Sequence, residues 1–319
     1  MAKGFEVEFA TGGSASSFLS SFGYRVHNVV RAPVPLESKG KLIFSTLWYL
    51  RYWYGYQSTI SRMLRLVEVA RPDFVVGDEE FTSVSIAMRK KLKHAMITDE
   101  RELAFARGFI ASVVEERVKR WYAELQKKVS CLIIPDFGHN EGNVHFVTPV
   151  VREVTMSRDD VLSRYDLPQN RRIVIFSMSG SRIGGYIAEK AIWAYKRARL
   201  EDTILVITGE ESTKPPDGSV YHLGFLRDNQ NLVAASDLVI SLAGKSTIDE
   251  ALSNGVPMIA IPLKNHFEQE KNARNLGFSH DDINHLDSLI IERIGKFSEP
   301  RRYSGATIAA DLLASLISR

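Results

Sequence analysis

The feature that most constrains the fold of this chain is an alternation of short apolar runs with longer amphipathic segments. In the C-terminal half, apolar runs occupy residues 172–176, 204–208, 220–223, 238–242 and 258–261. Most of these runs are separated by segments of helical length. Such alternation is typical of parallel sheets with helices on both faces. The sequence therefore predicts an α/β fold.

The N-terminal half carries a second set of candidate strands, at residues 5–10, 25–29, 74–76, 95–98 and 131–134. After Val150 and Val151 the composition turns charged, and the next set of strands begins. A chain of 319 residues also exceeds the size at which a single core usually stops growing. We therefore predict two domains, residues 1–150 and 151–319.

Composition excludes several classes of protein. The chain is 45% hydrophobic and 25% charged, with a formal net charge of +3, as expected of an ordinary globular protein without a nucleic-acid partner. No window approaches the ~18 uninterrupted apolar residues of a membrane span, and the N-terminus lacks the apolar region of a signal peptide. The single cysteine, Cys131, lies in an apolar run, which favours a reducing, cytoplasmic location. Composition leaves the oligomeric state open.

A candidate anion site follows the apolar run that ends near residue 242. The run leads through Ala243, Gly244, Lys245 and Ser246 into a helix predicted to begin at Thr247. A helix N-terminus has about four unpaired N–H groups and the positive end of the helix dipole, so it binds phosphate. Glu250 would lie one turn in, where its carboxylate can accept both hydroxyls of a ribose.

The same residues admit a second interpretation, whereas a third is excluded. Ser246 or Thr247 can simply cap the helix, with Asp249 and Glu250 interacting favourably with its dipole. A P-loop is excluded, because that motif needs a glycine where this chain has Val239.

Three further loops follow predicted strands, at the sheet edge where open α/β sheets bind ligands. Phe225 and Leu226 can lie against a base, and Glu268 and Gln269 can bond sugar hydroxyls. The small-residue loop suited to a phosphate consists of Ser179, Gly180 and Ser181.

These segments resemble the family 28 glycosyltransferases. That family includes the bacterial transferase that adds N-acetylglucosamine to the lipid-linked peptidoglycan precursor, and the chain is more similar to an archaeal branch. The resemblance rests on residues 222–225, 234–250, 268–269 and 272–273. It implies a GT-B fold, in which two Rossmann-like domains with parallel sheets face a central cleft, and a donor that is usually a UDP-sugar.

The resemblance also implies where the donor binds. The base would lie near Phe225 and Leu226, the ribose on Glu250, and the pyrophosphate over residues 243–247. The sugar would lie near Glu268 and Gln269. Lys245 departs from the small or apolar residue expected there, and both a phosphate contact and a solvent-exposed position remain open.

The acceptor side is less complete. Members of the resembled family begin with a strand and a glycine-rich turn that carries a histidine. This sequence lacks both. Either its start is assigned too far downstream, or the chain is a paralogue that lost these elements. Asp78, Asp99 and Glu100 follow strands and are candidates for acceptor contact or for general base, although such residues are often helix caps. The aromatic and basic segment 39–54 can contact a membrane if the acceptor is lipid-linked, or it can be a core helix.

The resemblance implies transfer of a hexose or N-acetylhexosamine by single displacement with inversion. No Asp-x-Asp pair occurs, so we expect no metal and no cofactor beyond the nucleotide-sugar co-substrate. Two alternatives stay open: a nucleotide-sugar 2-epimerase or hydrolase on the same fold, and a donor-binding paralogue without activity.

Overall fold

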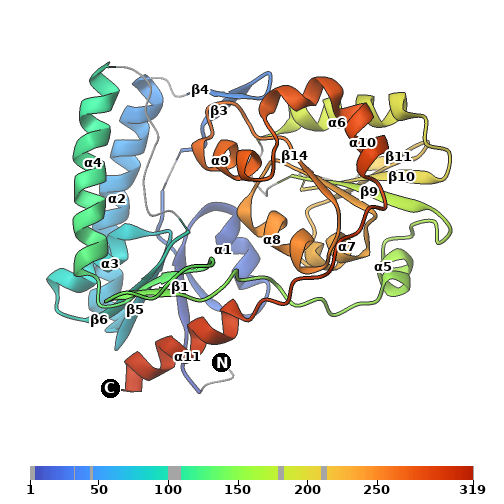
Figure 1. The fold of residues 1–319 in the computed structure, drawn as a ribbon. Coiled ribbons are helices and arrows are strands. Elements are labelled where there is room, and N and C mark those ends of the chain that lie inside the picture. The colour runs from blue at the N-terminus through green and yellow to red at the C-terminus, as the bar shows by residue number, and fades with distance from the viewer. Residues whose placement is uncertain are drawn as a thin grey trace. The chain divides into compact units, whose positions relative to one another are not determined.

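The chain forms two compact units in the computed structural model, which describes residues 4–31, 33–43, 46–99, 109–178, 183–209 and 214–318. The side chains of residues 46, 47, 49 and 109–115 are also outside the description. Unit 1 comprises residues 1–33, 45–150 and 303–319, and unit 2 comprises residues 34–44 and 151–302. Figure 1 colours the chain from blue at the N-terminus to red at the C-terminus.

Two segments depart from the continuous domains, 1–150 and 151–319, that the sequence predicts. The hairpin of β3 (Leu36–Ser38) and β4 (Lys41–Ile43) belongs to unit 2, where Leu42 is buried and its amide donates to the Lys264 carbonyl at 2.9 Å. The C-terminal helix α11 (Gly305–Ser318) belongs to unit 1, where Leu312 and Leu316 pack against the core. Both segments therefore bury apolar side chains in the unit that is distant from them in sequence.

Unit 2 is built on a six-stranded sheet in the order β11-β12-β10-β9-β13-β14. All its strand pairs are parallel except β11 with β12, which confirms the predicted α/β class. The central strands β9 and β10 are covered on both faces, which explains their continuous apolar sequences. The strands are β9 (Arg172–Ser177), β10 (Thr203–Thr208), β11 (Lys214–Asp217), β12 (Val220–Gly224), β13 (Leu238–Ser241) and β14 (Met258–Ala260).

Helices cover both faces of this sheet. Figure 1 shows α6 and α10 together on one side of β9 and β10, and α7 and α8 on the other. One core of apolar side chains joins the strands to these helices. The helices of unit 2 are α5 (Arg158–Arg164), α6 (Gly185–Ala198), α7 (Asn229–Ala235), α8 (Lys245–Ser253), α9 (Phe267–Asn275), α10 (Leu286–Arg293) and a 3₁₀ helix, His280–His285.

Unit 1 contains a four-stranded parallel sheet in the order β5-β6-β7-β8 and a two-stranded parallel sheet of β1 and β2. Its strands are β1 (Glu8–Thr11), β2 (Arg25–Asn28), β5 (Phe74–Asp78), β6 (Lys93–Ile97), β7 (Leu132–Ile134) and β8 (Val144–Phe146). Besides α11 its helices are α1 (Gly13–Ser20), α2 (Thr46–Ala70), α3 (Phe81–Arg89) and α4 (Phe109–Lys128).

Candidate functional site

The carboxyl ends of the unit 2 strands form one row across the sheet. Ser177 of β9 is in register with Thr208 of β10 on one side and with Ser241 of β13 on the other. Thr208 pairs in turn with Gly224, and Ser241 with Ala260. The loops that leave this row therefore start from one edge, the edge at which open α/β sheets bind ligands.

The turn from β13 into α8 is fixed by two hydrogen bonds. The Ala243 amide donates to Ser241 Oγ at 3.1 Å, and Asn272 Nδ2 donates to the Ala243 carbonyl at 3.1 Å. Ala243 is fully buried and has a φ of 61°, a left-handed conformation that turns the chain sharply. As a result α8 begins at Lys245, with Gly244 as its N-cap, and not at Thr247 as the sequence predicts.

The early start changes what lies at the N-terminus of α8. Ser246 and Thr247 are inside the first turn, so the interpretation of either as the N-cap is wrong. The first turn contains no acidic residue, and Gly244 supplies no side-chain cap. A β-carbon on Gly244 would meet no described heavy atom within 4 Å, so the space beside this backbone is open. An open, uncapped helix N-terminus is suited to an anion.

Lys245 does not extend into solvent. Its Nζ lies 2.6 Å from Asp249 Oδ2, one turn further along α8, and its side chain is 22% exposed. The Lys245 ammonium is therefore held near the N-terminal end of α8 in an ion pair.

Glu250 lies in the second turn of α8 and is 2% exposed. Both of its oxygens accept from the guanidinium of Arg152, at 2.7 Å from Nε and 3.2 Å from Nη2. Sequence reasoning missed Arg152, because no local motif marks a residue that lies 98 positions from its partner. The pair holds the Glu250 carboxylate in place, one turn along α8 from the anion site.

The segment after β12 is tied to the same pair. Phe225 is 52% exposed, whereas Leu226 packs against the core. The Arg227 carbonyl accepts from Arg152 Nη1 at 3.4 Å. Arg152 thus links the predicted base-binding segment to Glu250.

The two residues predicted to bind the sugar differ in environment. Gln269 is 5% exposed, and its Oε1 accepts from the Leu263 amide at 3.0 Å, which stabilises the loop before α9. Glu268 lies half-buried in the first turn of the same helix. The sugar contacts of both residues stay a prediction.

The predicted phosphate loop of Ser179, Gly180 and Ser181 lies outside the described residues. The helix that follows it, α6, has Gly184 as its N-cap. The Gly184 amide donates to Glu37 Oε2 of the β3–β4 hairpin at 2.6 Å. A carboxylate of the protein therefore already lies at the N-terminus of α6.

In unit 1, acidic residues gather where β5 and β6 end. Asp78 ends β5, and Asp99 follows β6, whereas Glu100 lies outside the described residues. The Asp99 amide donates to Glu79 Oε1 at 2.8 Å. Glu80 is used as a cap, since its carboxylate accepts from the amides of Thr82 and Ser83 at 2.9 and 2.8 Å.

Two carboxyl groups at this edge have raised pKa values. Loss of hydrating water, reinforced by the neighbouring Asp99 charge, raises the pKa of Asp78. Desolvation is also the largest influence on Glu79 and raises its pKa to about 7, against the opposing hydrogen bonds from Thr98 and the Asp99 amide. Glu79 belongs to the run that pointed to Asp78, but sequence reasoning did not select it.

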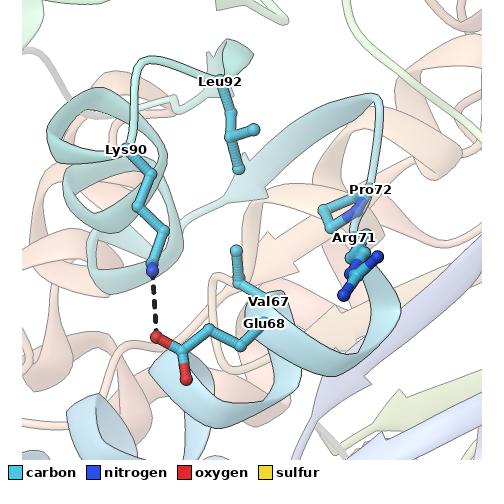
Figure 2. A pocket seen from close by; sticks show the side chains of 6 residues that line it. All are labelled: Val67, Glu68, Arg71, Pro72, Lys90 and Leu92. Atoms are coloured by element: carbon cyan, nitrogen blue, oxygen red, sulfur yellow. Dashed lines mark hydrogen bonds and ion pairs between the residues drawn. The ribbon is translucent and has the colours of Figure 1, made fainter.

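A hollow of about 360 Å³ lies elsewhere on unit 1. Figure 2 shows Lys90 reaching across it to Glu68, with 3.0 Å between Nζ and Oε1. The hollow is at the amino ends of β5 and β6, opposite the acidic residues, and no predicted site residue lines it. Its lining residues are Val67, Glu68, Arg71, Pro72, Lys90 and Leu92.

The segment 39–54 is not one helix. Residues 39–43 belong to the hairpin of unit 2, and α2 of unit 1 begins at Thr46. Leu50, Trp53 and Tyr54 of α2 are 60%, 62% and 74% exposed, so these three side chains are not core residues. Within the described part of the chain, no helix combines the length and the apolar character needed to cross a bilayer.

Comparisons with known proteins show that this chain is similar to glycosyltransferases. Residues 174–296 match the model of the glycosyltransferase family 28 C-terminal domain. An uncharacterized glycosyltransferase of Methanosarcina mazei is 26% identical over 99% of this chain and 88% of its own length. The UDP-N-acetylglucosamine–N-acetylmuramyl-(pentapeptide) pyrophosphoryl-undecaprenol N-acetylglucosamine transferase of Exiguobacterium sibiricum is 26% identical over 80% of this chain and 72% of its own.

Solved structures confirm the predicted fold. A spinosyn rhamnosyltransferase in complex with thymidine diphosphate superposes with a TM-score of 0.60 at 17% identity, covering 99% of this chain and 90% of that one. The likeness shows the GT-B architecture of two Rossmann-like domains.

Proposed function

Because the chain is a family 28 glycosyltransferase with a GT-B fold, we propose that it transfers a hexose or N-acetylhexosamine from a UDP-sugar to an acceptor hydroxyl. The observation that carries this proposal is the open N-terminus of α8, beside the buried carboxylate of Glu250. The amides of the first turn would bind the diphosphate, and Glu250 would accept the ribose hydroxyls.

The other donor contacts follow from the loops on the same strand row. The exposed ring of Phe225, with Leu226 behind it, would lie against the base, and Glu268 and Gln269 would bond the sugar. Ser179, Gly180 and Ser181 are proposed as a second phosphate contact. The Glu37 carboxylate on the Gly184 amide favours α8 over α6 as the main diphosphate site, because like charges repel.

We propose a metal-independent single displacement with inversion. The acceptor oxygen attacks the anomeric carbon from the face opposite the diphosphate, and the carbon–oxygen bond to the phosphate breaks as the new bond forms. UDP leaves with the bonding electron pair, and its charge is met by the α8 amides, the helix dipole and Lys245. The absence of an Asp-x-Asp pair supports a mechanism without a metal.

The acceptor proton must pass to a base. Asp78, Asp99 and Glu100 remain the proposed acceptor-side carboxyl groups, and the structure adds Glu79. A base works best with a pKa near the working pH, which favours Glu79, whose pKa is raised to about 7. A pH–rate profile whose acidic limb moves in Glu79→Gln but not in Asp99→Asn would identify it.

Isothermal calorimetry with UDP tests the donor site. We expect micromolar binding by the wild type and a loss of at least about 30-fold in Glu250→Ala, the usual worth of hydrogen bonds to a charged group. Glu189→Ala, an exposed carboxylate on α6, is the matched control and should bind as the wild type does. No binding of UDP, or equal binding by Glu250→Ala, would refute the proposal.

We further propose that the acceptor is lipid-linked and that α2 contacts the membrane. The exposed Leu50, Trp53 and Tyr54 have the composition of an interfacial anchor, and the Exiguobacterium relative is named for an undecaprenol-linked acceptor. Cosedimentation with phosphatidylcholine vesicles, with and without phosphatidylglycerol, tests this. Trp53→Ser with Tyr54→Ser should abolish cosedimentation while UDP binding persists, and unchanged cosedimentation would contradict it.

A further inference from the structure

We infer that Arg152 is a positioning residue that fixes the Glu250 carboxylate so that the donor site distinguishes ribose from 2′-deoxyribose. This inference rests on the proposed function, because it assumes that Glu250 binds the pentose. It assigns the discrimination between two sugars to a residue that need not touch the nucleotide.

The contact between the two side chains is a fork. Arg152 donates from Nε to Glu250 Oε1 and from Nη2 to Oε2, at 2.7 and 3.2 Å. Two parallel bonds fix both the position and the plane of a carboxylate, which a single point charge cannot do. The arrangement therefore defines the directions in which Glu250 can accept further hydrogen bonds.

The carboxylate has acceptor positions that Arg152 does not use. An ionised carboxylate offers about four acceptor positions, and the guanidinium uses one on each oxygen. The remaining positions, one on each oxygen, suit the two adjacent hydroxyls of a ribose. A 2′-deoxyribose would leave one of them unused, so its nucleotide should bind more weakly.

Arg152 is itself held in place. Its third nitrogen, Nη1, donates to the Arg227 carbonyl at 3.4 Å. Three residues later the Thr155 amide donates at 2.8 Å to Asn231 Oδ1, on a side chain that is 1% exposed. The segment that carries Arg152 is thus anchored to α7, so the guanidinium has a fixed base from which to orient Glu250.

Burial explains why the pair is needed. Glu250 is 2% exposed, whereas the Arg152 side chain is 43% exposed. A buried carboxylate without a partner is strongly unfavourable, but an exposed guanidinium can be hydrated. Replacing Arg152 should therefore displace the Glu250 side chain far more than replacing Glu250 would displace the Arg152 side chain.

The test measures the affinity of each protein for UDP and for 2′-deoxy-UDP by calorimetry. The ratio of the two affinities is then compared between the wild type and the variants. We expect the wild type to prefer UDP by about 10- to 100-fold, the range for one hydrogen bond to a charged group. In Arg152→Met the preference should fall to within about 3-fold, mainly through weaker UDP binding. Arg172→Met removes an exposed arginine at the amino end of β9, the opposite end of the strand from the site, and should keep the wild-type preference.

Arg152→Lys covers the case in which the methionine variant does not fold, because it keeps the charge and removes the fork. Its preference should also fall below about one third of the wild-type value. A variant that loses UDP and 2′-deoxy-UDP by the same factor would overturn the inference, since Arg152 would then act on the diphosphate or on the fold. Absence of UDP binding by the wild type would overturn the proposed function as well.

Discussion

The N-termini of α3 in unit 1 and α8 in unit 2 have the same place in the topology but differ in charge. A carboxylate caps the first, and no side chain caps the second. Both helices follow a parallel strand, β5 for α3 and β13 for α8. At α3 the Glu80 carboxylate accepts from the amides of Thr82 and Ser83. At α8 the N-cap is Gly244, which has no side chain to cap with. The fold alone therefore does not create an anion site; the residue at the N-cap decides whether the amides are used within the protein.

The N-terminus of α6 shows that a carboxylate distant in sequence can also lie at the N-terminus of a helix. Glu37 comes from the β3–β4 hairpin and accepts from the Gly184 amide. Of these three strand-following helices, α8 is the one for which no carboxylate is described in contact with the amides at its N-terminus. This difference is the physical basis for placing the diphosphate there.

The largest expected effect comes from making α8 resemble α3. In Gly244→Asp a carboxylate would occupy the N-cap, where the open space accepts it without strain. It should repel the diphosphate and compete for the same amides, so we expect UDP affinity to fall by at least about 100-fold. Calorimetry with UDP measures the loss, and thermal unfolding should show a melting temperature equal to or slightly above that of the wild type, since aspartate caps a helix at least as well as glycine.

Gly244→Asn is the matched control, because asparagine has nearly the same shape and caps without a charge. It should lose much less affinity than Gly244→Asp. Equal losses in the two variants would mean that bulk, and not charge, closes the site.

Removal of the Lys245 charge should have the next largest effect. In Lys245→Gln the cation beside the open N-terminus is lost, and we expect UDP to bind about 10-fold more weakly, the usual worth of one charge-assisted contact. Uridine, which lacks phosphate, should bind equally well to both proteins. Lys245→Arg should keep most of the UDP affinity. If uridine and UDP weakened together, Lys245 would contribute to the fold and not to phosphate binding.

At α3 the corresponding change should affect stability only. Glu80→Gln weakens the cap of a helix for which we propose no donor contact, and we expect a loss of about 1 kcal/mol in unfolding free energy. The midpoint of urea denaturation measures it, with Glu6→Gln, an exposed residue before β1, as control. A change in UDP affinity in Glu80→Gln would contradict the division of roles between the two helices.

The sequence was informative where burial is continuous. β9 and β10 were predicted because a strand covered on both faces must be apolar along its whole length. The start of α8 was predicted wrongly, at Thr247, because threonine and serine are favoured N-caps. The real start depends on Ala243 in a left-handed conformation, which a non-glycine residue adopts only where the surrounding structure enforces it.

Contacts distant in sequence could not be predicted. Arg152 lies 98 residues from Glu250, and Glu37 lies 147 residues from Gly184. Neither residue belongs to a periodic pattern or a motif, so only the folded chain shows that one orients a carboxylate and the other occupies a helix N-terminus. The strand and helix that carry the proposed donor site were thus predictable from sequence, but the interactions that orient their side chains were not.

The remaining expected effect concerns the acidic edge of unit 1 and is seen only in the pH dependence of stability. The pKa of Glu79 is raised from 4.5 to about 7, so the folded state holds a proton that the unfolded state has released between these values. The contribution of Glu79 to stability is therefore fully present below pH 4.5 and is lost as the pH rises through 7. The melting temperature of the wild type should fall over this interval relative to that of Glu79→Gln, in which the group is always neutral.

His266, whose pKa is lowered by burial, acts in the opposite direction in both proteins, so the difference between the two curves isolates Glu79. If the melting temperatures of the two proteins changed in parallel with pH, Glu79 would titrate as an ordinary surface carboxyl group. The acidic edge of unit 1 would then differ from the N-terminus of α8 only in carrying negative charge.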